Sequence, residues 1–474
     1  MLPAKFGTSG LRGLASVLLD GTAERYTRAF ARHLKGHVSG TGQANVLVAS
    51  DLRASSPQLK EQVMAALVTE GLEPVDCGCV PTPALASAAI RKGVPAVMVT
   101  GSHIAADRNG LKFYLASGEI SKSDEMDITV LAQGMDSVPA GAALRVASSF
   151  TDIAQDFLDR YSRFLPMNGL QGLRIGVYEH STVARDMLSL LLRNNGADVV
   201  ALGRCSDFLA VDTEAVGTET ERSLRLWAEQ YDLDAIVSAD GDGDRPMVAD
   251  EKGILLRGEM LGILTAQFLG ADIVVTPVTS NSGTERNLSC PVIRTRVGSP
   301  YVIAGMDEAR QAGCTSVFGF EANGGVLTGT DMRLGDFILP ALPTRDAFLP
   351  ILCVLGRMAR AGVELSQLVS LLKMQSAIAG KLEKLPANVS EFFRQGQAGH
   401  QRLAGLVGAV YEVASVDLTD GWRATLADGS VVHLRMSGNE PALRCYIEAA
   451  TEAGAQALLR RVGDLITKDL AGVT

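Results

Sequence analysis

The sequence predicts a multidomain α/β protein, in which three segments of alternating strands and helices precede a C-terminal α+β segment. Three observations support this prediction: a length of 474 residues, an apolar share of 47%, and a strand–helix–strand pattern that recurs along the chain. The length suggests three or four domains, and the apolar share is ample for a packed core in each of them.

The recurring pattern consists of an apolar strand, a polar loop, a helix and a second strand opened and closed by glycine. The first copy has a strand at Asn45 to Ala49, a helix at Pro57 to Glu70 and the segment Gly71 to Gly78. The second copy has Leu173 to Tyr178, a helix through Asn195 and Gly196 to Gly203, and the third has Asp272 to Pro277, a helix ending near Ala312 and Gly313 to Gly319. This alternation predicts α/β layers with mixed or mainly parallel sheets and functional loops at strand ends.

The pattern changes beyond about Val369. A polar helical stretch is followed by short alternating strands between Tyr411 and Leu434, a strand at Leu443 to Glu448 and a closing helix at Ala453 to Leu470. We therefore expect a fourth, α+β domain, with domain boundaries at residues 1–145, 146–252, 253–368 and 369–474.

Charge and cysteine content narrow the class of protein. A net charge of -9 argues against general binding to nucleic acid or to an anionic membrane. The seven cysteines are odd in number and include a CxC pair but no CxxC, so neither a disulfide framework nor a structural zinc site is indicated. No 18-residue apolar run occurs, and the N-terminal stretch with Lys5 and Arg12 lacks an apolar core. We expect a soluble, cytoplasmic protein without a signal peptide.

The most informative stretch is Asp-Gly-Asp-Gly-Asp-Arg at residues 240–245, directly after the apolar run Ala235 to Val237. Alternate spacing places the carboxylates of Asp240, Asp242 and Asp244 on one side of the backbone, and glycine lets the chain curl around one ion. Oxygen ligands without cysteine or histidine favour Mg²⁺, Ca²⁺ or Mn²⁺. An EF-hand loop is excluded because its sixth position requires glycine and here holds Arg245, and a solvated acidic turn is disfavoured because the carboxylates would repel one another.

Ser102 follows a second apolar run, Val94 to Val99, at the place where a strand would emerge into a loop. A serine hydroxyl attacks only with the help of a base or a reactive electrophile, such as phosphorus neutralised by cations. No Gly-x-Ser-x-Gly elbow surrounds it, which disfavours an α/β-hydrolase. Residues 107–110 read as a turn, after which a strand from Leu111 to Tyr114 would return Lys112 to the serine loop.

Two further loops offer polar groups for a small ligand. After the strand-like segment ending at Phe320, Glu321 and Asn323 stand in a glycine-rich loop and suit vicinal sugar hydroxyls. Near the C-terminus, Arg435 and Arg444 flank the loop Ser437-Gly438-Asn439, which suits a phosphate group. This second loop is not a P-loop, because the Gly-Lys-Ser/Thr ending is missing.

The ordered set of loops resembles the four signatures of the α-D-phosphohexomutase superfamily, preceded by the similar N-terminal segment Gly7 to Gly13. The resemblance spans the whole chain, and the amino-acid sequences of the loops look most like those of the bacterial phosphomannomutase branch. It implies a heart-shaped, four-domain phosphohexomutase whose last domain is like the TATA-box-binding protein. It also implies sugar phosphates as the only partners, and a monomer or a homodimer.

The resemblance further implies a role for each loop. Ser102 carries the transferable phosphoryl group and, with Asp240, Asp242 and Asp244, holds Mg²⁺, and Arg245 lies beside them. Arg12 and Lys112 act near the reacting hydroxyl. Glu321 and Asn323 grip the sugar, and the phosphate that does not react is held by Arg435, Ser437, Gly438, Asn439 and Arg444. A hexose 1,6-bisphosphate would be both intermediate and activator, in an isomerase of carbohydrate metabolism.

The chain departs from the superfamily pattern at three places. The position where many members carry a histidine is Gly325, and Asn323 replaces a serine. His103, Lys112 or Arg12 must therefore transfer the proton. A Thr-Lys-x-Gly-His segment of relatives appears here as Thr295 to Ser299, so Arg296 is expected to contact sugar or phosphate. In the loop between Arg435 and Arg444, the threonine that is frequent in relatives is replaced by Asn439.

Interconversion of mannose 6-phosphate and mannose 1-phosphate is the function we expect. Glucose or glucosamine phosphate are alternative substrates within the superfamily, because spacing in a sequence does not encode one stereocentre. A metal-dependent sugar-phosphate phosphatase and a non-catalytic sensor are alternatives of other classes. The Arg435 to Arg444 loop argues against the phosphatase, and the intact Ser102 and acidic loop argue against the sensor.

Overall fold

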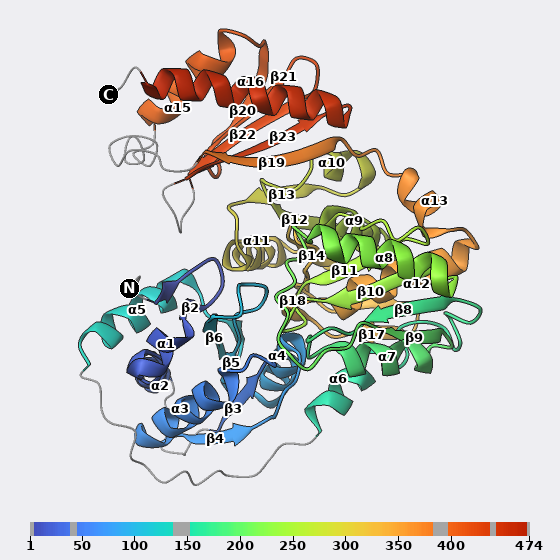
Figure 1. Ribbon diagram of the computed structural model, residues 1–474. Helices are drawn as coiled ribbons and strands as arrows, with labels where there is room; N and C mark the ends of the chain where they lie inside the picture. Colours follow the sequence, from blue (N-terminus) through green and yellow to red (C-terminus); the bar gives the residue numbers. More distant parts are fainter. Residues whose placement is uncertain (1–3, 38–44, 136–151, 383–396, 437–441, 472–474) are drawn as a thin grey trace. The chain divides into compact units, whose positions relative to one another are not determined.

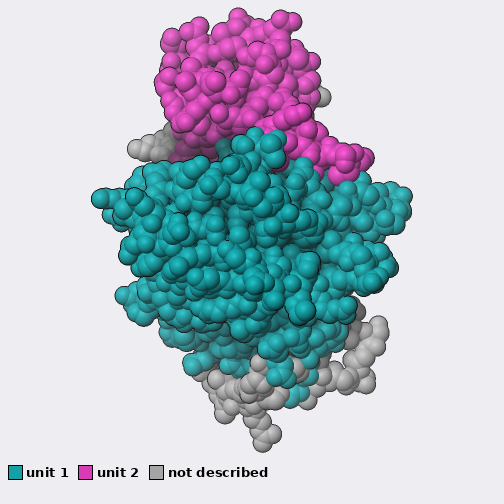
Figure 2. All heavy atoms as spheres, turned by 90° about the vertical axis from the view of Figure 1, so that its right-hand side faces the viewer, with its two compact units in different colours: residues 1–274, 298–371 teal, residues 275–297, 372–474 magenta. Residues whose placement is uncertain are grey.

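The computed structural model describes residues 4–37, 45–135, 152–382, 397–436 and 442–471 (Figure 1). The chain divides into two compact units (Figure 2): unit 1 comprises Met1–Val274 and Gly298–Leu371, and unit 2 comprises Val275–Val297 and Leu372–Thr474. Within the described ranges, no helix is both long enough and apolar enough to cross a membrane.

The first sheet of unit 1 is mixed and has the strand order β1-β2-β6-β5-β3-β4, with β7 paired to β6. Its parallel pairs are β3 with β4 and β3 with β5, and the other pairs are antiparallel. The strands are Lys5–Phe6, Leu11–Leu14, Asn45–Ser50, Glu73–Asp76, Ala96–Val99, Arg108–Leu115 and Gly118–Glu119 (β1 to β7). The helices are Ala15–Val17, Ala23–His37, Ser56–Thr69, Thr82–Lys92 and Lys122–Gln133 (α1 to α5), with a π-helical turn at Leu18–Thr22.

Strand β6 begins at Arg108, so the turn expected at residues 107–110 is wrong for all but its first residue. The reason is tertiary: β2 pairs with this segment, opposing Leu14 to Arg108 and Arg12 to Gly110. Gly110 is suited to that pairing, because an added Cβ would lie 2.4 Å from the carbonyl oxygen of Leu11. The return of Lys112 toward the serine loop is as expected, since Met98 of β5 opposes it.

The second sheet of unit 1 has the order β11-β10-β8-β9 and is also mixed. Strand β10 runs parallel to β8 and antiparallel to β11, and β8 runs parallel to β9. The strands are Arg174–Tyr178, Asp198–Leu202, Ala235–Ala239 and Pro246–Ala249 (β8 to β11), and the helices are Ile153–Tyr161, Arg185–Asn194 and Thr218–Tyr231 (α6 to α8). Strand β10 is buried along its whole length, as its unbroken run of small and apolar residues predicts.

A third sheet has the order β13-β12-β14-β15-β18, and a small hairpin pairs β16 with β17. The strands are Ile273–Pro277, Val292–Thr295, Val317–Phe320, Val326–Thr328, Met332–Leu334, Phe337–Leu339 and Leu342–Asp346 (β12 to β18). The helices are Gly258–Leu269, Gly283–Asn287, Ser299–Gln311, Phe348–Ala361 and Leu365–Ser370 (α9 to α13). The predicted α/β class with mixed sheets is confirmed.

Unit 2 contains an antiparallel sheet of order β19-β23-β22-β21-β20. Its strands are Ser376–Leu382, Val413–Asp417, Trp422–Leu426, Val431–Met436 and Leu443–Ala449 (β19 to β23), and its helices are Gln397–Gly408 (α15) and Glu452–Ala471 (α16). Both helices lie against one face of the sheet (Figure 1). The α+β architecture is as expected, whereas the four domain boundaries and the likeness to the TATA-box-binding protein stay predictions.

Strand β19 corrects the expectation of a helical stretch just beyond Val369. Seven consecutive residues of β19 pair with β23, from Ser376 opposite Ala449 to Leu382 opposite Leu443. The short and weakly apolar sequence of β19 has no strong periodicity of its own, so this pairing decides its conformation.

Candidate functional site

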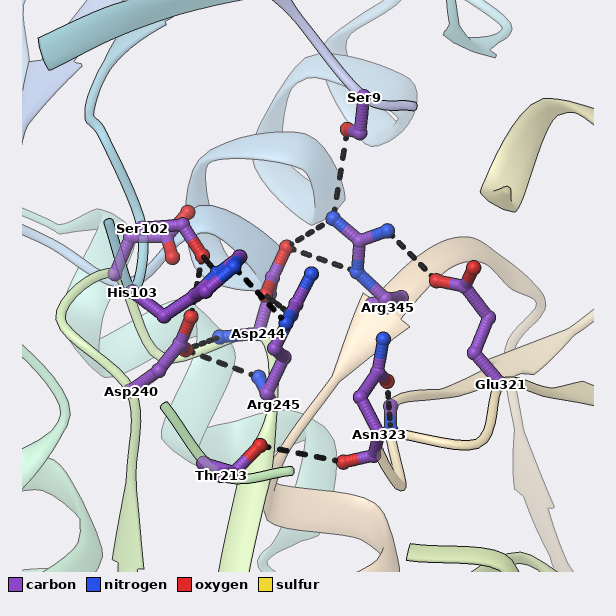
Figure 3. A network of polar contacts seen from close by, with 12 residues as sticks. Ser9, Ser102, His103, Thr213, Asp240, Asp244, Arg245, Glu321, Asn323 and Arg345 are labelled. Carbon is purple, nitrogen blue, oxygen red and sulfur yellow. Dashed lines mark hydrogen bonds and ion pairs between the residues drawn. The ribbon is translucent and has the colours of Figure 1, made fainter. Parts of the chain in front are cut away.

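Three loops that follow strands of three different sheets meet in unit 1. Strand β5 leads to Ser102, β10 leads to the acidic loop 240–245, and β14 leads to Glu321 and Asn323. Figure 3 shows these side chains directed toward one another, together with Arg345 from β18. Each of these three loops thus lies directly after a strand, where the alternating pattern of the sequence placed it.

Ser102 lies in a loop whose backbone is tightly held. Its φ of 54° falls in the left-handed region, which is unusual for a residue other than glycine. Its amide donates to Thr100 Oγ1 at 2.8 Å, and its side chain, which is 1% exposed, donates to Asp240 Oδ2 at 2.5 Å. His103 Nδ1 lies 3.1 Å from the same hydroxyl oxygen. The hydroxyl thus points at the first carboxylate of the acidic loop.

Arg53 binds the backbone of the Ser102 loop, a role that the sequence did not suggest. One of its terminal nitrogens donates to the carbonyl oxygens of Ser102 and Ile104, at 2.8 and 2.6 Å. The other donates to the carbonyl oxygens of Ala105 and Arg108, at 2.7 and 2.8 Å. Because the guanidinium is rigid and planar, it fixes four carbonyl groups of the loop in one geometry.

The acidic loop brings its three carboxylates together as predicted. Asp240, Asp242 and Asp244 are at most 1% exposed, and one oxygen of each lies within 4.8 Å of the others. Asp240 Oδ1 also accepts from the amides of Asp244 and Arg245, both at 3.1 Å, which closes the turn around Gly243 at φ 74°. The second carboxylate, Asp242, accepts from Thr82 Oγ1 at 2.5 Å.

The donor set fits a hard divalent cation. Asp242 Oδ1 and Asp244 Oδ1 are buried atoms without a hydrogen-bond partner among the described residues. Unpaired buried carboxylate oxygens are costly, and a bound cation would compensate them. Burial, together with the neighbouring Asp242 and Asp244, raises the pKa of Asp240 well above its ordinary value, because crowded like charges favour the neutral acid.

Four cationic side chains surround the carboxylates. Lys112 Nζ donates to Asp242 Oδ2 at 2.6 Å and to Asp244 Oδ2 at 2.5 Å. Burial opposes the charge on Lys112, but the two carboxylates outweigh it and raise its pKa. For Asp244, burial favours the neutral acid, yet Arg345 and Lys112 hold its pKa well below the ordinary range. Lys112 is therefore a fixed cation in this arrangement.

Arg12 and Arg245 complete the positive cluster. Burial and repulsion from Arg245 and Arg345 lower the pKa of Arg12 to about 10, and its Nη2 atom is buried without a hydrogen-bond partner among the described residues. Arg245 lies 3.5 Å from His103 Nε2 and 3.5 Å from Glu214 Oε2. Burial, Arg245 and Arg12 hold the pKa of His103 well below its ordinary value, so its imidazole is neutral.

The loop at residues 321–325, named the sugar loop for the role expected from the sequence, is ordered by contacts among its own residues and by Arg345. Asn323 Oδ1 accepts from the amide of Gly325 at 2.9 Å, and Glu321 Oε2 accepts from Arg345 Nη1 at 2.8 Å. Thr213 Oγ1 reaches the Asn323 carbonyl oxygen at 3.5 Å. Sequence reasoning missed Arg345, since a lone arginine in a short strand carries little signal. The one signal for Arg345 in the sequence is the glycine at position 325, whose missing side chain leaves room for the arginine stem.

The remaining predicted residues lie in unit 2. Arg435 and Arg444 are directly opposed on β22 and β23, so both side chains project from one face of the sheet. Arg435 Nε donates to Asp420 Oδ2 at 2.8 Å, and Arg296 Nε donates to the neighbouring Thr419 carbonyl oxygen at 3.2 Å. Lys381 of β19 opposes Arg444 on its other side and was not predicted. Ser437, Gly438 and Asn439 lie outside the described residues.

Comparison with known proteins agrees with this arrangement. Family models described as phosphoglucomutase/phosphomannomutase match the chain over residues 3–137 (alpha/beta/alpha domain I), 257–374 (alpha/beta/alpha domain III) and 389–465 (C-terminal domain). A phosphomannomutase of Sinorhizobium fredii is 45% identical over 465 residues, which cover 96% of this chain and 97% of the relative. A phosphomannomutase of Salmonella muenchen is 40% identical over 453 residues, covering 95% and 93%.

A solved structure shows the same fold. The putative phosphomannomutase from Thermus thermophilus is similar with a TM-score of 0.77 at 23% identity, covering 98% of this chain and 99% of that one. The phosphomannomutase relatives and the family models together indicate an isomerase of the phosphotransferase type. The chain belongs to the phosphoglucomutase/phosphomannomutase family.

Proposed function

We propose that this enzyme interconverts mannose 6-phosphate and mannose 1-phosphate through a phosphorylated Ser102 and a hexose 1,6-bisphosphate that also activates it. The observation that carries the proposal is the position of Ser102 Oγ, 2.5 Å from Asp240 and next to a cluster of carboxylates and cations. The similarity to two phosphomannomutases supports mannose as the sugar. Glucose and glucosamine phosphates are the competing substrates to be tested.

The charge balance of the site supports phosphoryl transfer. Arg12, Lys112, Arg245 and Arg345 face Asp240, Asp242, Asp244 and Glu321, so a phosphoryl group would add two negative charges to a nearly neutral cluster. A divalent cation held by Asp240, Asp242, Asp244 and the phosphate on Ser102 would offset them, and Mg²⁺ is the ion that this all-oxygen set favours. When bound, the ion would neutralise charge on the phosphoryl oxygens.

In the transfer step, the bond between Ser102 Oγ and phosphorus breaks while the sugar hydroxyl oxygen bonds to phosphorus. One proton moves overall from the sugar hydroxyl to Ser102 Oγ. His103 is the best candidate to relay this proton, because it is neutral and lies 3.1 Å from Oγ. Lys112 is charged and engaged by two carboxylates, and the buried Nη2 of Arg12 suits a phosphoryl oxygen, so both suit charge stabilisation better.

Binding of the rest of the substrate is assigned to two groups of residues. Glu321 and Asn323 would accept and donate hydrogen bonds to sugar hydroxyls. The phosphate that does not react is assigned to unit 2, to Arg435, Ser437, Gly438, Asn439 and Arg444. Arg296 would contact the sugar or this phosphate. A cytoplasmic setting, suggested by the odd number of cysteines, is part of the same proposal.

The test is turnover with mannose, glucose and glucosamine 1-phosphates, each with a hexose 1,6-bisphosphate and Mg²⁺, combined with a search for phosphate on Ser102 by intact mass and peptide mapping. We expect the highest kcat/KM with mannose 1-phosphate, and stimulation by the bisphosphate. Mannose 1-phosphate as the poorest substrate would overturn the sugar assignment. Release of free phosphate without isomerisation would instead indicate a phosphatase.

A further inference from the structure

Arg345 is the one side chain that contacts both the acidic loop and the sugar loop in Figure 3. It is 2% exposed and comes from β18. Its Nε and Nη2 atoms donate to Asp244 Oδ2 at 3.1 and 2.7 Å, and its Nη1 donates to Glu321 Oε2 at 2.8 Å. A weaker contact of 3.4 Å runs from Nη2 to Ser9 Oγ.

The sugar loop is shaped to receive this arginine. A Cβ atom at Gly325 would lie 2.7 Å from Arg345 Cδ and 3.0 Å from its Cγ. Any side chain at position 325 would therefore displace the stem of Arg345, whereas glycine leaves room for it. The side chain of Arg345 therefore packs directly against the backbone of the loop at Gly325.

Arg345 donates to only one oxygen of Asp244 and one oxygen of Glu321, so the second oxygen of each carboxylate is not used by Arg345. Asp244 uses Oδ2 for Arg345 and Lys112, while its Oδ1 is buried without a hydrogen-bond partner among the described residues and lies 4.0 Å from Arg245 Nε. Glu321 uses Oε2 for Arg345, so that Oε1 lies outside this ion pair. The planar guanidinium fork fixes both carboxylates at once, and a lysine ammonium would not do so with the same geometry.

We propose that Arg345 is a positioning residue that couples cation binding at Asp244 to sugar binding at Glu321. This inference rests on the proposed function, because it takes the acidic loop as the cation site and Glu321 as a sugar contact. One rigid guanidinium is bonded to both Asp244 and Glu321, so a shift of either carboxylate on ligand binding moves the guanidinium and with it the other carboxylate. By linkage, the cation strengthens sugar binding by the same factor by which the sugar strengthens cation binding.

The experiment measures this factor directly on the unphosphorylated full-length enzyme. Mn²⁺ is titrated by calorimetry without and with saturating mannose 1-phosphate, and glucose 1-phosphate serves as a second sugar probe. In the wild type, we expect the sugar to tighten Mn²⁺ binding at least about fivefold. In Arg345→Lys, which keeps the charge but not the fork, we expect this ratio to fall to about one.

Controls separate coupling from general damage. Arg28→Lys changes another buried arginine, paired with Glu70 at 3.0 Å, and should keep the wild-type ratio. Gly325→Ala keeps every charge but crowds the Arg345 stem, and should also lower the ratio. Folding of Arg345→Lys is judged by melting and circular dichroism. If this variant does not fold, Glu321→Gln, which removes the ion pair of Arg345 with Glu321, is used in its place.

The outcomes distinguish this inference from the proposed function. A ratio of one in the wild type with both sugar phosphates, or a wild-type ratio in Arg345→Lys or in its replacement Glu321→Gln, would overturn the coupling role. Because the ratio is a binding quantity measured with two sugars, it is independent of which sugar the enzyme turns over. Poor turnover of mannose 1-phosphate with the ratio intact would count against the substrate alone.

Discussion

Ser102 Oγ and Asp240 Oδ2 lie 2.5 Å apart although the two residues are 138 positions apart in the chain. Each follows a buried strand of a different sheet, and neither strand directs its loop to the other by local sequence. The contact places the candidate nucleophile against the first carboxylate of the candidate cation site. Most of the chemistry proposed for this enzyme follows from that single contact.

Replacing Ser102 by alanine removes the oxygen that would carry the phosphoryl group. We expect kcat to fall by at least about a thousandfold, while the circular dichroism spectrum and melting temperature change little. The covalent phosphate seen by intact mass should also disappear. Ser223→Ala, at an exposed hydroxyl on α8, is the matched control. Near-normal turnover of Ser102→Ala would refute the assignment of the nucleophile.

Replacing Asp242 by asparagine halves the oxygen donors of a carboxylate whose Oδ1 atom has no protein partner among the described residues. We expect the Mg²⁺ concentration needed for half-maximal turnover to rise at least about tenfold, because the cation loses a charged ligand. Chelation of the wild type should abolish turnover, and added Mg²⁺ should restore it. Circular dichroism should not change on chelation. Unfolding of the chelated enzyme would instead show that the ion is structural.

Gly101 lies against the arginine that holds the Ser102 loop. An alanine Cβ there would lie 2.7 Å from Cζ and 2.8 Å from Nε of Arg53. We expect Gly101→Ala to destabilise the protein by about 1–3 kcal/mol, as overpacking does, and to lower kcat more than it changes KM. The free energy of unfolding and steady-state kinetics provide the measurements. Gly217→Ala, where nothing lies within 4 Å of the added atom, should be neutral in both, and equal behaviour of the two variants would contradict the role of Arg53.

Arg435, which we assign to the phosphate that does not react, is anchored by Asp420 at 2.8 Å. We expect Arg435→Ala to weaken binding of the sugar phosphate by about 1.5–3 kcal/mol, the cost of a lost charged hydrogen bond. This corresponds to a rise in KM of roughly 12- to 150-fold. Arg402→Ala, in the same unit but paired with Asp469, is the control. Unchanged KM and kcat in Arg435→Ala would remove it from the site.

His433 should make unit 2 sensitive to acid. It is 1% exposed, and burial, together with Arg423 and Arg435, lowers its pKa to about 4 despite the opposing influence of Asp420. The unfolded chain, with an ordinary histidine pKa, binds a proton first as the pH falls, so stability is lost between about pH 6.5 and 4. The full loss for this group is on the order of 3 kcal/mol.

The measurement uses Trp422, which is buried in the core of unit 2. With Trp227 replaced by phenylalanine, fluorescence-detected urea unfolding reports on unit 2, since the chain has two tryptophans. His433→Gln should flatten the dependence of the unfolding free energy on pH between about 4.5 and 6.5. If the unfolding free energy of His433→Gln depends on pH as steeply as that of the wild-type protein, another group is responsible for the acid sensitivity.

The sequence by itself determined those features that are local or periodic. The buried strand Ala235–Ala239 was predictable from its unbroken run of small and apolar residues, and the convergence of three carboxylates from their alternation with glycine. Helices such as Ser56–Thr69 and Glu452–Ala471 begin and end within one residue of the expected positions, because their limits are set by local residues. The order of the motifs also indicated the family.

Tertiary structure alone decided the rest, since these features depend on partners distant in the chain. Strand pairing turned residues 108–110 and Ser376–Leu382 into strands, because hydrogen bonds from β2 and β23 outweigh weak local preferences. Folding also brought Arg53 under the Ser102 loop and Arg345 between Asp244 and Glu321. A buried guanidinium takes its role from the oxygens around it, and no spacing along a sequence specifies which carbonyls and carboxylates the fold will supply.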